Sequence, residues 1–287
     1  ISYAKSMAKW HSMRFGGVVS TQDQHPSERK SVEALATTLF GKRNGLVQRP
    51  PFYTFYDSFA RLQLDALFKQ WPHGTTNILI TRSAAAALCS YPRDTSIDEY
   101  FTPTFLKSLR SGSRFASFEP GLKRRPNVIV HVRRGDGIKL HAPRGAMDAR
   151  FYHLIERVQS LLRKHKPEVQ VFSKKEGTDT SSSFDGYRKR GATIHLSGKL
   201  FKDWAHMSKA DVFIMARSSF SFAPALFNKN CVVYQQFCLA PLSDWLPSNK
   251  LSLRQLVACL PVTITTHSVR SGTGRASVVE EWQWMPG

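Results

Sequence analysis

The pattern of apolar and polar residues changes along the chain. The first fifty residues are polar and rich in turn-forming residues, and they end at Pro50-Pro51. Behind a candidate cap at Asp57 or Ser58, apolar residues then recur at helical spacing, at Phe55, Phe59, Leu62, Ala66 and Leu67. The segment 77–81 (NILIT) is typical of a short strand, and we predict a helix around 83–89.

From residue 127 onward, strands and helices alternate. The pattern predicts strands at 127–132, 169–173, 191–196, 211–216 and 231–235, and helices at 148–164, 202–209 and 220–227. The strands are continuous apolar runs, which indicates an α/β fold with a parallel sheet covered on both faces. Right-handed crossovers then favour a doubly wound, Rossmann-like domain, in which ligands bind beyond the carboxyl ends of the strands. The Gly-, Ser- and charge-rich segment 111–125 marks the boundary between an N-terminal domain, 1–120, and a C-terminal domain, 121–287.

A charged cluster follows the first of these strands, in the stretch NVIVHVRRGDG (127–137). His131 and Arg133 point to one face and lie at the carboxyl end of the strand, where a guanidinium offers a planar fork to phosphate oxygens. Two glycines let the backbone approach a ligand, and Asp136 is placed to orient Arg133 or Arg134, or to cap the next element. The alternative is a surface ion network without a ligand.

A second candidate site follows the predicted strand 211–216. Ser218 and Ser219 stand just before a predicted helix, whose free N–H groups and dipole attract anions, and Arg217 adds positive charge. The alternative is that both serines only cap the helix. Asp203, at the start of the helix 202–209, is either a cap or a carboxylate that accepts the N1–H and N2–H of a guanine.

These two stretches resemble known motifs. The stretch His131-Val132-Arg133-Arg134-Gly135-Asp136 resembles the H-x-R-R-[GT]-D motif shared by the α1,2-, α1,6- and protein O-fucosyltransferases, which use GDP-fucose. The stretch from Asp203 through the S-x-A-D sequence at 208–211 to Ser218-Ser219 is similar to a later motif of the same enzymes. The two motifs stand in the same order, and the resemblance covers about residues 127–235, the donor-binding half.

The resemblance implies a GT-B fold, with two Rossmann-like domains, and an inverting transfer of fucose from GDP-fucose to a glycan or protein acceptor. It implies no metal and no cofactor beyond this donor substrate, and a place in the Golgi or ER lumen. Arg133 would bind the β-phosphate and, together with Asp136, would be catalytic. Asp203 would recognise the guanine through hydrogen bonds. The implied donor-binding set is His131, Arg133, Arg134, Asp203, Arg217, Ser218 and Ser219.

The chain also departs from that family. Where many members carry an acidic pair, it has Ser173-Lys174-Lys175-Glu176. No carboxylate stands out as the base for the acceptor hydroxyl, and Asp136, Asp148 and Glu176 are all weak candidates.

Composition adds a second hypothesis. The chain has 41 Lys and Arg against 21 Asp and Glu, a net charge of +20, with basic runs at 123–125, 163–166 and 188–190. Such charge favours a polyanionic partner, because binding to an RNA backbone needs little else. The alternative is therefore a catalytically silent, fucosyltransferase-like subunit bound to RNA or to a large assembly, in an organelle matrix such as that of the mitochondrion. A solvated basic face is the simpler reading of each run.

Cysteine usage and hydropathy say less. Cys89, Cys231, Cys238 and Cys259 fit neither zinc spacing nor a disulfide framework for a chain of 287 residues, so one or two bridges and the redox compartment stay open. No apolar run approaches the roughly 18–20 residues that a membrane span needs, so we predict no span in this chain.

Overall fold

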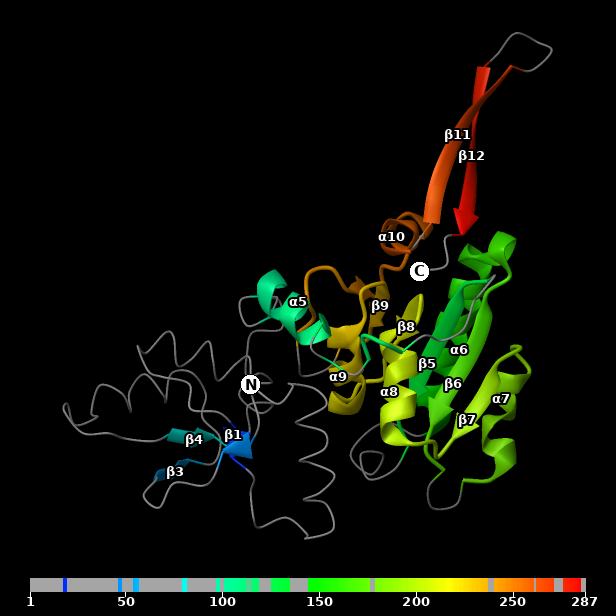
Figure 1. Ribbon diagram of the computed structural model, residues 1–287. Helices are drawn as coiled ribbons and strands as arrows, with labels where there is room; N and C mark the ends of the chain where they lie inside the picture. Colours follow the sequence, from blue (N-terminus) through cyan, green and yellow to red (C-terminus); the bar gives the residue numbers. More distant parts are fainter. Residues whose placement is uncertain are drawn as a thin grey trace. The chain divides into compact units, whose positions relative to one another are not determined.

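The computed structural model describes residues 18–19, 46–47, 54–56, 79–81, 97–98, 101–111, 113, 115–118, 125–134, 144–175, 179–236, 240–260, 262–270 and 276–284 (Figure 1). The chain divides into two compact units. The first comprises Ile1–Ser117 with Gln236–Asp244, and the second comprises Phe118–Gln235 with Trp245–Gly287.

The described strands of the first unit form two parallel pairs. Strand β1 (Val18–Val19) pairs with β2 (Leu46–Val47), and β3 (Thr54–Tyr56) pairs with β4 (Leu79–Thr81). Strand β4 lies inside the strand predicted at 77–81. Phe55, which was predicted to be helical, instead pairs with Ile80 of β4, so strand pairing overrides the local apolar spacing there. The other apolar positions of that predicted helix, and the helix predicted around 83–89, lie outside the described residues.

A segment from late in the sequence returns to the first unit. The Ile97 N–H donates to the Pro241 carbonyl at 3.2 Å, and the Ser243 N–H donates to Asp98 Oδ1 at 3.1 Å. Ile97 and Leu242 are buried. The predicted division at residue 120 lies close to the break after Ser117 but does not include this return of Gln236–Asp244. Helix α5 (Pro103–Ser111) also belongs to this unit.

The second unit contains a six-stranded sheet in which all neighbours are parallel (Figure 1). Its strands in chain order are β5 (Asn127–Val132), β6 (Glu168–Ser173), β7 (Thr193–Leu196), β8 (Val212–Ile214), β9 (Cys231–Tyr234) and β10 (Leu246–Pro247). Their order across the sheet is β10-β9-β8-β5-β6-β7. Numbered from β5, this is the order 3-2-1-4-5-6 of a Rossmann-like sheet. The predicted α/β class and parallel sheet are confirmed.

The three longest helices of the second unit, α6, α8 and α9, overlap the three helices predicted from the sequence. The described helices are α6 (Arg144–Leu161), η3 (Arg163–His165), η4 (Ser181–Phe184), α7 (Asp185–Arg188), α8 (Leu200–Ser208), α9 (Ser219–Phe227) and α10 (Leu253–Cys259). Helix α6 begins at Arg144 rather than at 148. The short helices α7 and α10 were not predicted, nor was strand β10.

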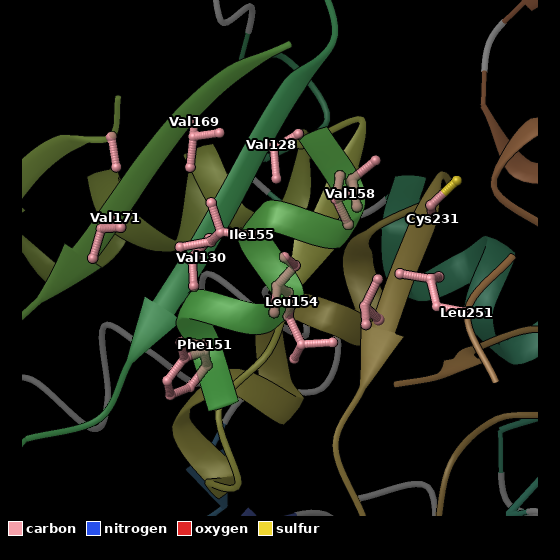
Figure 2. Packing of buried hydrophobic residues seen from close by; sticks show 14 of the residues in the cluster. Val128, Val130, Phe151, Leu154, Ile155, Val158, Val169, Val171, Cys231 and Leu251 are labelled. Carbon is pink, nitrogen blue, oxygen red and sulfur yellow. The ribbon is translucent and has the colours of Figure 1, made fainter. Parts of the chain in front are cut away.

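One face of the sheet packs against α6. Alternate residues of β5, namely Val128, Val130 and Val132, point to this face and are almost fully buried. Figure 2 shows Val128 and Val130 against an apolar stripe of α6 that includes Phe151, Leu154, Ile155 and Val158. Each such side chain contributes about 1.5–3 kcal/mol when fully buried, so this layer contributes substantially to the unit's stability.

The opposite face of the sheet carries histidine and phenylalanine side chains and is covered by α8 and α9. His131, Phe172 and His195 occupy neighbouring register positions on β5, β6 and β7. His206 of α8 contacts Phe172 with ring centroids 5.5 Å apart, and Phe220 of α9 contacts His131 at 4.8 Å. Helices therefore lie on both faces of the sheet, as in a doubly wound domain.

The remaining elements follow the sheet. A disulfide joins Cys231, at the start of β9, to Cys259, at the end of α10, with a Cα–Cα distance of 5.1 Å. Strands β11 (Val262–Arg270) and β12 (Ala276–Trp284) form an antiparallel hairpin. Within the described part of the chain, no helix has the length and apolar character needed to cross a bilayer.

Removing the disulfide should destabilise the second unit. For a sequence separation of 28 residues, the chain-entropy model gives about 3–4 kcal/mol, so we expect the double variant Cys231→Ala/Cys259→Ala to lose that free energy of unfolding in urea. A reducing agent should destabilise wild type similarly and add little to the double variant. Leu253→Ala, an exposed position of α10, is the control and should change stability by less than about 0.5 kcal/mol. Equal losses in the variant and this control would contradict the prediction.

Candidate functional site

The strand order reverses beside β5, and this creates a place for a ligand. From β5 the chain proceeds to β6 and β7 on one side, and then returns to β8 on the other side. Ligands of such sheets bind at this reversal, beyond the carboxyl ends of the two strands. Here the predicted residues on the β5 side are His131 and Arg133, and those on the β8 side are Arg217, Ser218 and Ser219. We call these five residues the switch-point site.

The ring of Phe220 connects the elements that meet at the switch-point site. The His131 ring lies 4.8 Å from it at an interplanar angle of 32°, and the Trp204 ring of α8 lies 5.4 Å away at 69°. Because Phe220 directly follows Ser219, these contacts place the end of β5 beside the first turn of α9. The two stretches predicted to act together are therefore brought together by the fold.

His131 is held from two sides. The residue is only 4% exposed, and its Nδ1 atom forms a hydrogen bond with the Ser221 hydroxyl of α9. Burial, and to a smaller extent the charge of Arg133, lowers the pKa of His131 from 6.5 to about 3. The imidazole is therefore neutral at physiological pH and offers hydrogen bonds rather than charge.

Cationic side chains gather along the same edge of the sheet. Arg133 follows β5 and is half-buried, Lys174 and Lys175 follow β6 and are exposed, and Arg217 follows β8 and is exposed. The carboxyl ends of parallel strands share one edge, so these charges create a positive field there. The two lysines stand where the resembling enzymes carry acids, which makes this edge more attractive to an anion.

Ser218 and Ser219 begin α9 in different roles. Ser218 is the N-cap, since its hydroxyl accepts a hydrogen bond from the Phe220 N–H at 3.2 Å and its carbonyl accepts from Ser221 and Phe222 at 3.1 Å each. Ser219 is the first residue of the helix, and the N–H groups of a helix's first turn have no acceptor within the helix itself. This end of α9 therefore retains a donor for an anion.

Arg134 differs from its neighbour Arg133. Its side chain is buried, and its Nη2 donates to both oxygens of Asp148 at 2.9 and 2.8 Å. The Tyr187 hydroxyl donates to the same carboxylate at 2.6 Å, and burial together with Asp148 raises the pKa of Tyr187. The donor contact predicted for Arg134 does not fit this engagement, and neither does the base role considered for Asp148. We assign both residues to holding the end of β5 against α6 and α7.

Asp203 lies in the first turn of α8 but does not cap it. The N-cap is Lys199, which makes no side-chain capping bond. The carboxylate lies against the α-carbon of Gly198, at a place where any larger residue would collide with it. Partial burial raises the pKa of Asp203, and Lys202 opposes this rise. Among the described residues no donor reaches this carboxylate, so it is available to the N–H groups of a ligand.

Sequence reasoning missed three residues that organise the site. Phe220 and Trp204 lie in predicted helices but carry no predicted role, and Ser221 is not among the predicted site residues. The spacing Ser218-x-x-Ser221 was the available signal, because the third residue of a helix faces back over its N-cap.

Asp136 and Glu176 lie outside the described residues, and their predicted roles stay predictions. No group of three or more His, Cys, Asp or Glu with metal-binding geometry occurs in the described ranges.

The fold and the site define an α/β protein with a Rossmann-like parallel sheet and with cationic residues at its switch point. Neither a family model, nor a curated protein, nor a solved structure matches the chain.

Breaking the buried ion pair should cost far more than breaking an exposed one on the same helix. Asp148→Asn leaves Arg134 buried without a counter-charge, so we expect a loss of about 3–5 kcal/mol in the free energy of unfolding, measured in urea. The control is Glu156→Gln, which removes the more exposed partner of Arg190 (2.7 Å) and should cost less than about 1 kcal/mol. Similar losses for both variants would show that Asp148 does not have the assigned structural role.

The buried, neutral His131 should make the protein less stable in mild acid. Below about pH 6.5 the unfolded chain takes up a proton on this imidazole, whereas the folded protein does so only near a pKa of about 3. Stability from this group is therefore complete above pH 6.5 and declines as the pH falls toward 3. Between pH 7.5 and 5.0, wild type should lose about 2 kcal/mol more unfolding free energy than His131→Phe does. Parallel losses in urea titrations at the two pH values would refute this.

Proposed function

We propose that the chain is a GDP-fucose-dependent glycosyltransferase of the two-domain GT-B type, whose second unit binds the donor. The observation that carries this proposal is the packing of His131 against Phe220 and Ser221, because it joins the two stretches that resemble the donor-binding motifs. The Rossmann-like strand order, with these stretches at its reversal, supports the proposal independently.

The diphosphate would bind between the ends of β5 and β8. Arg133 would bind the β-phosphate with its planar guanidinium, and the Ser219 N–H at the start of α9 would donate to a second phosphate oxygen. Arg217 would add charge at the exposed rim. Lys174 and Lys175 raise the positive potential that attracts the donor to this edge.

The guanine would bind near α8. Asp203 has two carboxylate oxygens that no donor reaches among the described residues, and a guanine presents N1–H and N2–H side by side. This pairing distinguishes GDP from UDP, since uracil lacks that pair of donors. The raised pKa of Asp203 reflects partial burial, which strengthens a hydrogen bond to the ionised carboxylate.

The reaction would be an inverting, metal-independent displacement. The acceptor hydroxyl attacks the anomeric carbon of fucose, the bond from that carbon to the β-phosphate oxygen breaks, and GDP leaves with an added negative charge. Arg133 and the start of α9 would stabilise this charge as it develops. Asp136 stays the predicted catalytic carboxylate and would take the proton that the acceptor hydroxyl loses. The acceptor would be a glycan or a protein.

The disulfide bears on the compartment. Structural disulfides persist in oxidising compartments and are rare where thiols are kept reduced. The bridge between Cys231 and Cys259 therefore supports the Golgi or ER lumen over an organelle matrix. A second candidate function, the silent RNA-associated subunit, is favoured by the net charge of +20.

Thermal stabilisation by nucleotides tests the proposal. We expect GDP to raise the melting temperature in the presence of EDTA, with GMP and UDP having little effect, because only GDP offers both a diphosphate and a guanine. A ligand at 100 times its Kd adds about 2.7 kcal/mol to stability. Arg133→Ala should abolish the shift. Arg188→Ala, an exposed arginine on α7 paired with Asp185, is the control and should retain it.

Two outcomes would contradict the proposal. A wild-type protein that GDP does not stabilise, but that binds RNA with an affinity falling steeply with salt, would favour the silent subunit. An Arg133→Ala variant that keeps the full GDP shift would mean that the phosphate site lies elsewhere. Transfer and hydrolysis assays with GDP-fucose then distinguish an enzyme from a binding protein.

A further inference from the structure

The fully buried hydroxyl of Ser221 determines which ring nitrogen of His131 carries the proton. Its oxygen accepts a hydrogen bond from the Ala216 N–H at 3.0 Å, at the end of β8, and lies within hydrogen-bond reach of His131 Nδ1. A buried hydroxyl needs an acceptor for its own proton. Among the described residues, no acceptor other than His131 Nδ1 is within reach of it. The Ser221 O–H therefore donates to Nδ1, which must be unprotonated.

The tautomer of His131 follows from this. A neutral imidazole carries one proton, so a ring that accepts at Nδ1 carries that proton at Nε2. Among the described residues, the Nε2 atom has no hydrogen-bond partner, so its proton is left for a ligand. The contact with Phe220 fixes the ring plane, so this N–H has one direction.

We propose that Ser221 is a positioning residue, which locks His131 as the Nε2–H tautomer so that the ring offers a neutral hydrogen-bond donor to an oxygen of the nucleotide. This inference rests on the proposed function for the identity of the ligand. It adds to that function a chain of hydrogen bonds, from the Ala216 N–H through Ser221 to His131, which couples the end of β8 to the donor atom presented by β5.

A neutral donor suits this place. Arg133 stands two residues away on the same face of β5, and a second cation beside it would be repelled. The lowered pKa of His131, to about 3, agrees with a ring that stays uncharged when an anion is bound nearby. The imidazole then adds direction to the site, while Arg133 adds charge.

Nuclear magnetic resonance of the histidine ring nitrogens tests the tautomer without any ligand. With ¹⁵N-labelled histidine, wild type should show an unprotonated Nδ1 and a protonated Nε2 for His131. Ser221→Thr keeps the hydroxyl and should keep this signature, whereas Ser221→Ala should give a mixture of the two tautomers. His195 is an internal reference, because its Nε2 donates to Gln170 Oε1 at 3.0 Å and does not involve Ser221.

Nucleotide binding tests the consequence. Loss of one well-placed neutral hydrogen bond should weaken GDP binding by roughly three- to tenfold in Ser221→Ala, with Ser221→Thr close to wild type. A protonated Nδ1 in wild type would overturn the tautomer assignment, even if GDP binds. An unchanged wild-type signature in Ser221→Ala would overturn the role of Ser221. If the tautomer is as expected but GDP stabilises no variant, wild type included, the assignment stands and the proposed function fails.

Discussion

The contact between His131 and the first turn of α9 is the constraint on which the switch point depends. The ladder between β5 and β8 ends at the pair Val130 and Ile214, so the residues that follow it on each strand need contacts of their own. Here the Phe220 ring lies against His131 on one side and Trp204 on the other, and the Ser221 hydroxyl joins the same imidazole to the end of β8. Three elements are thus positioned by two consecutive residues of one helix.

The alternation of side chains along β5 separates two kinds of arginine. Arg133 follows His131 on the face of α8 and α9, and it stays half-buried at the ligand edge. Arg134 follows Val132 on the face of α6, where Asp148 and Tyr187 engage it away from solvent. A motif with two adjacent arginines therefore supplies one cation for the ligand edge and one for the interior. Because a shift of one residue would exchange them, the register of β5 is tied to the function of the site.

Much of the second unit could be predicted from its sequence, and the exceptions have physical causes. Continuous apolar runs identify β5 and β9, and helical spacing identifies α6, because both patterns depend only on neighbours along the chain. Helices α7 and α10 are too short for a periodic pattern, and they are stabilised by tertiary contacts such as the burial of Tyr187. The roles of Arg134 and Ser221 could not be predicted for a similar reason, since their partners lie 14 and 90 residues away. The cap at Ser218, a strictly local feature, was one of two readings of the sequence.

The return of Gln236–Asp244 to the first unit has a consequence for biosynthesis. These residues leave the ribosome after β9, yet they belong to the first unit, where Ile97 and Asp98 form hydrogen bonds with their backbone. The first unit, although it begins at the amino terminus, is therefore still incomplete when most of the parallel sheet has already been synthesised. Domains that are continuous in sequence can mature one after the other during translation. In this chain the earlier unit must wait for the later one.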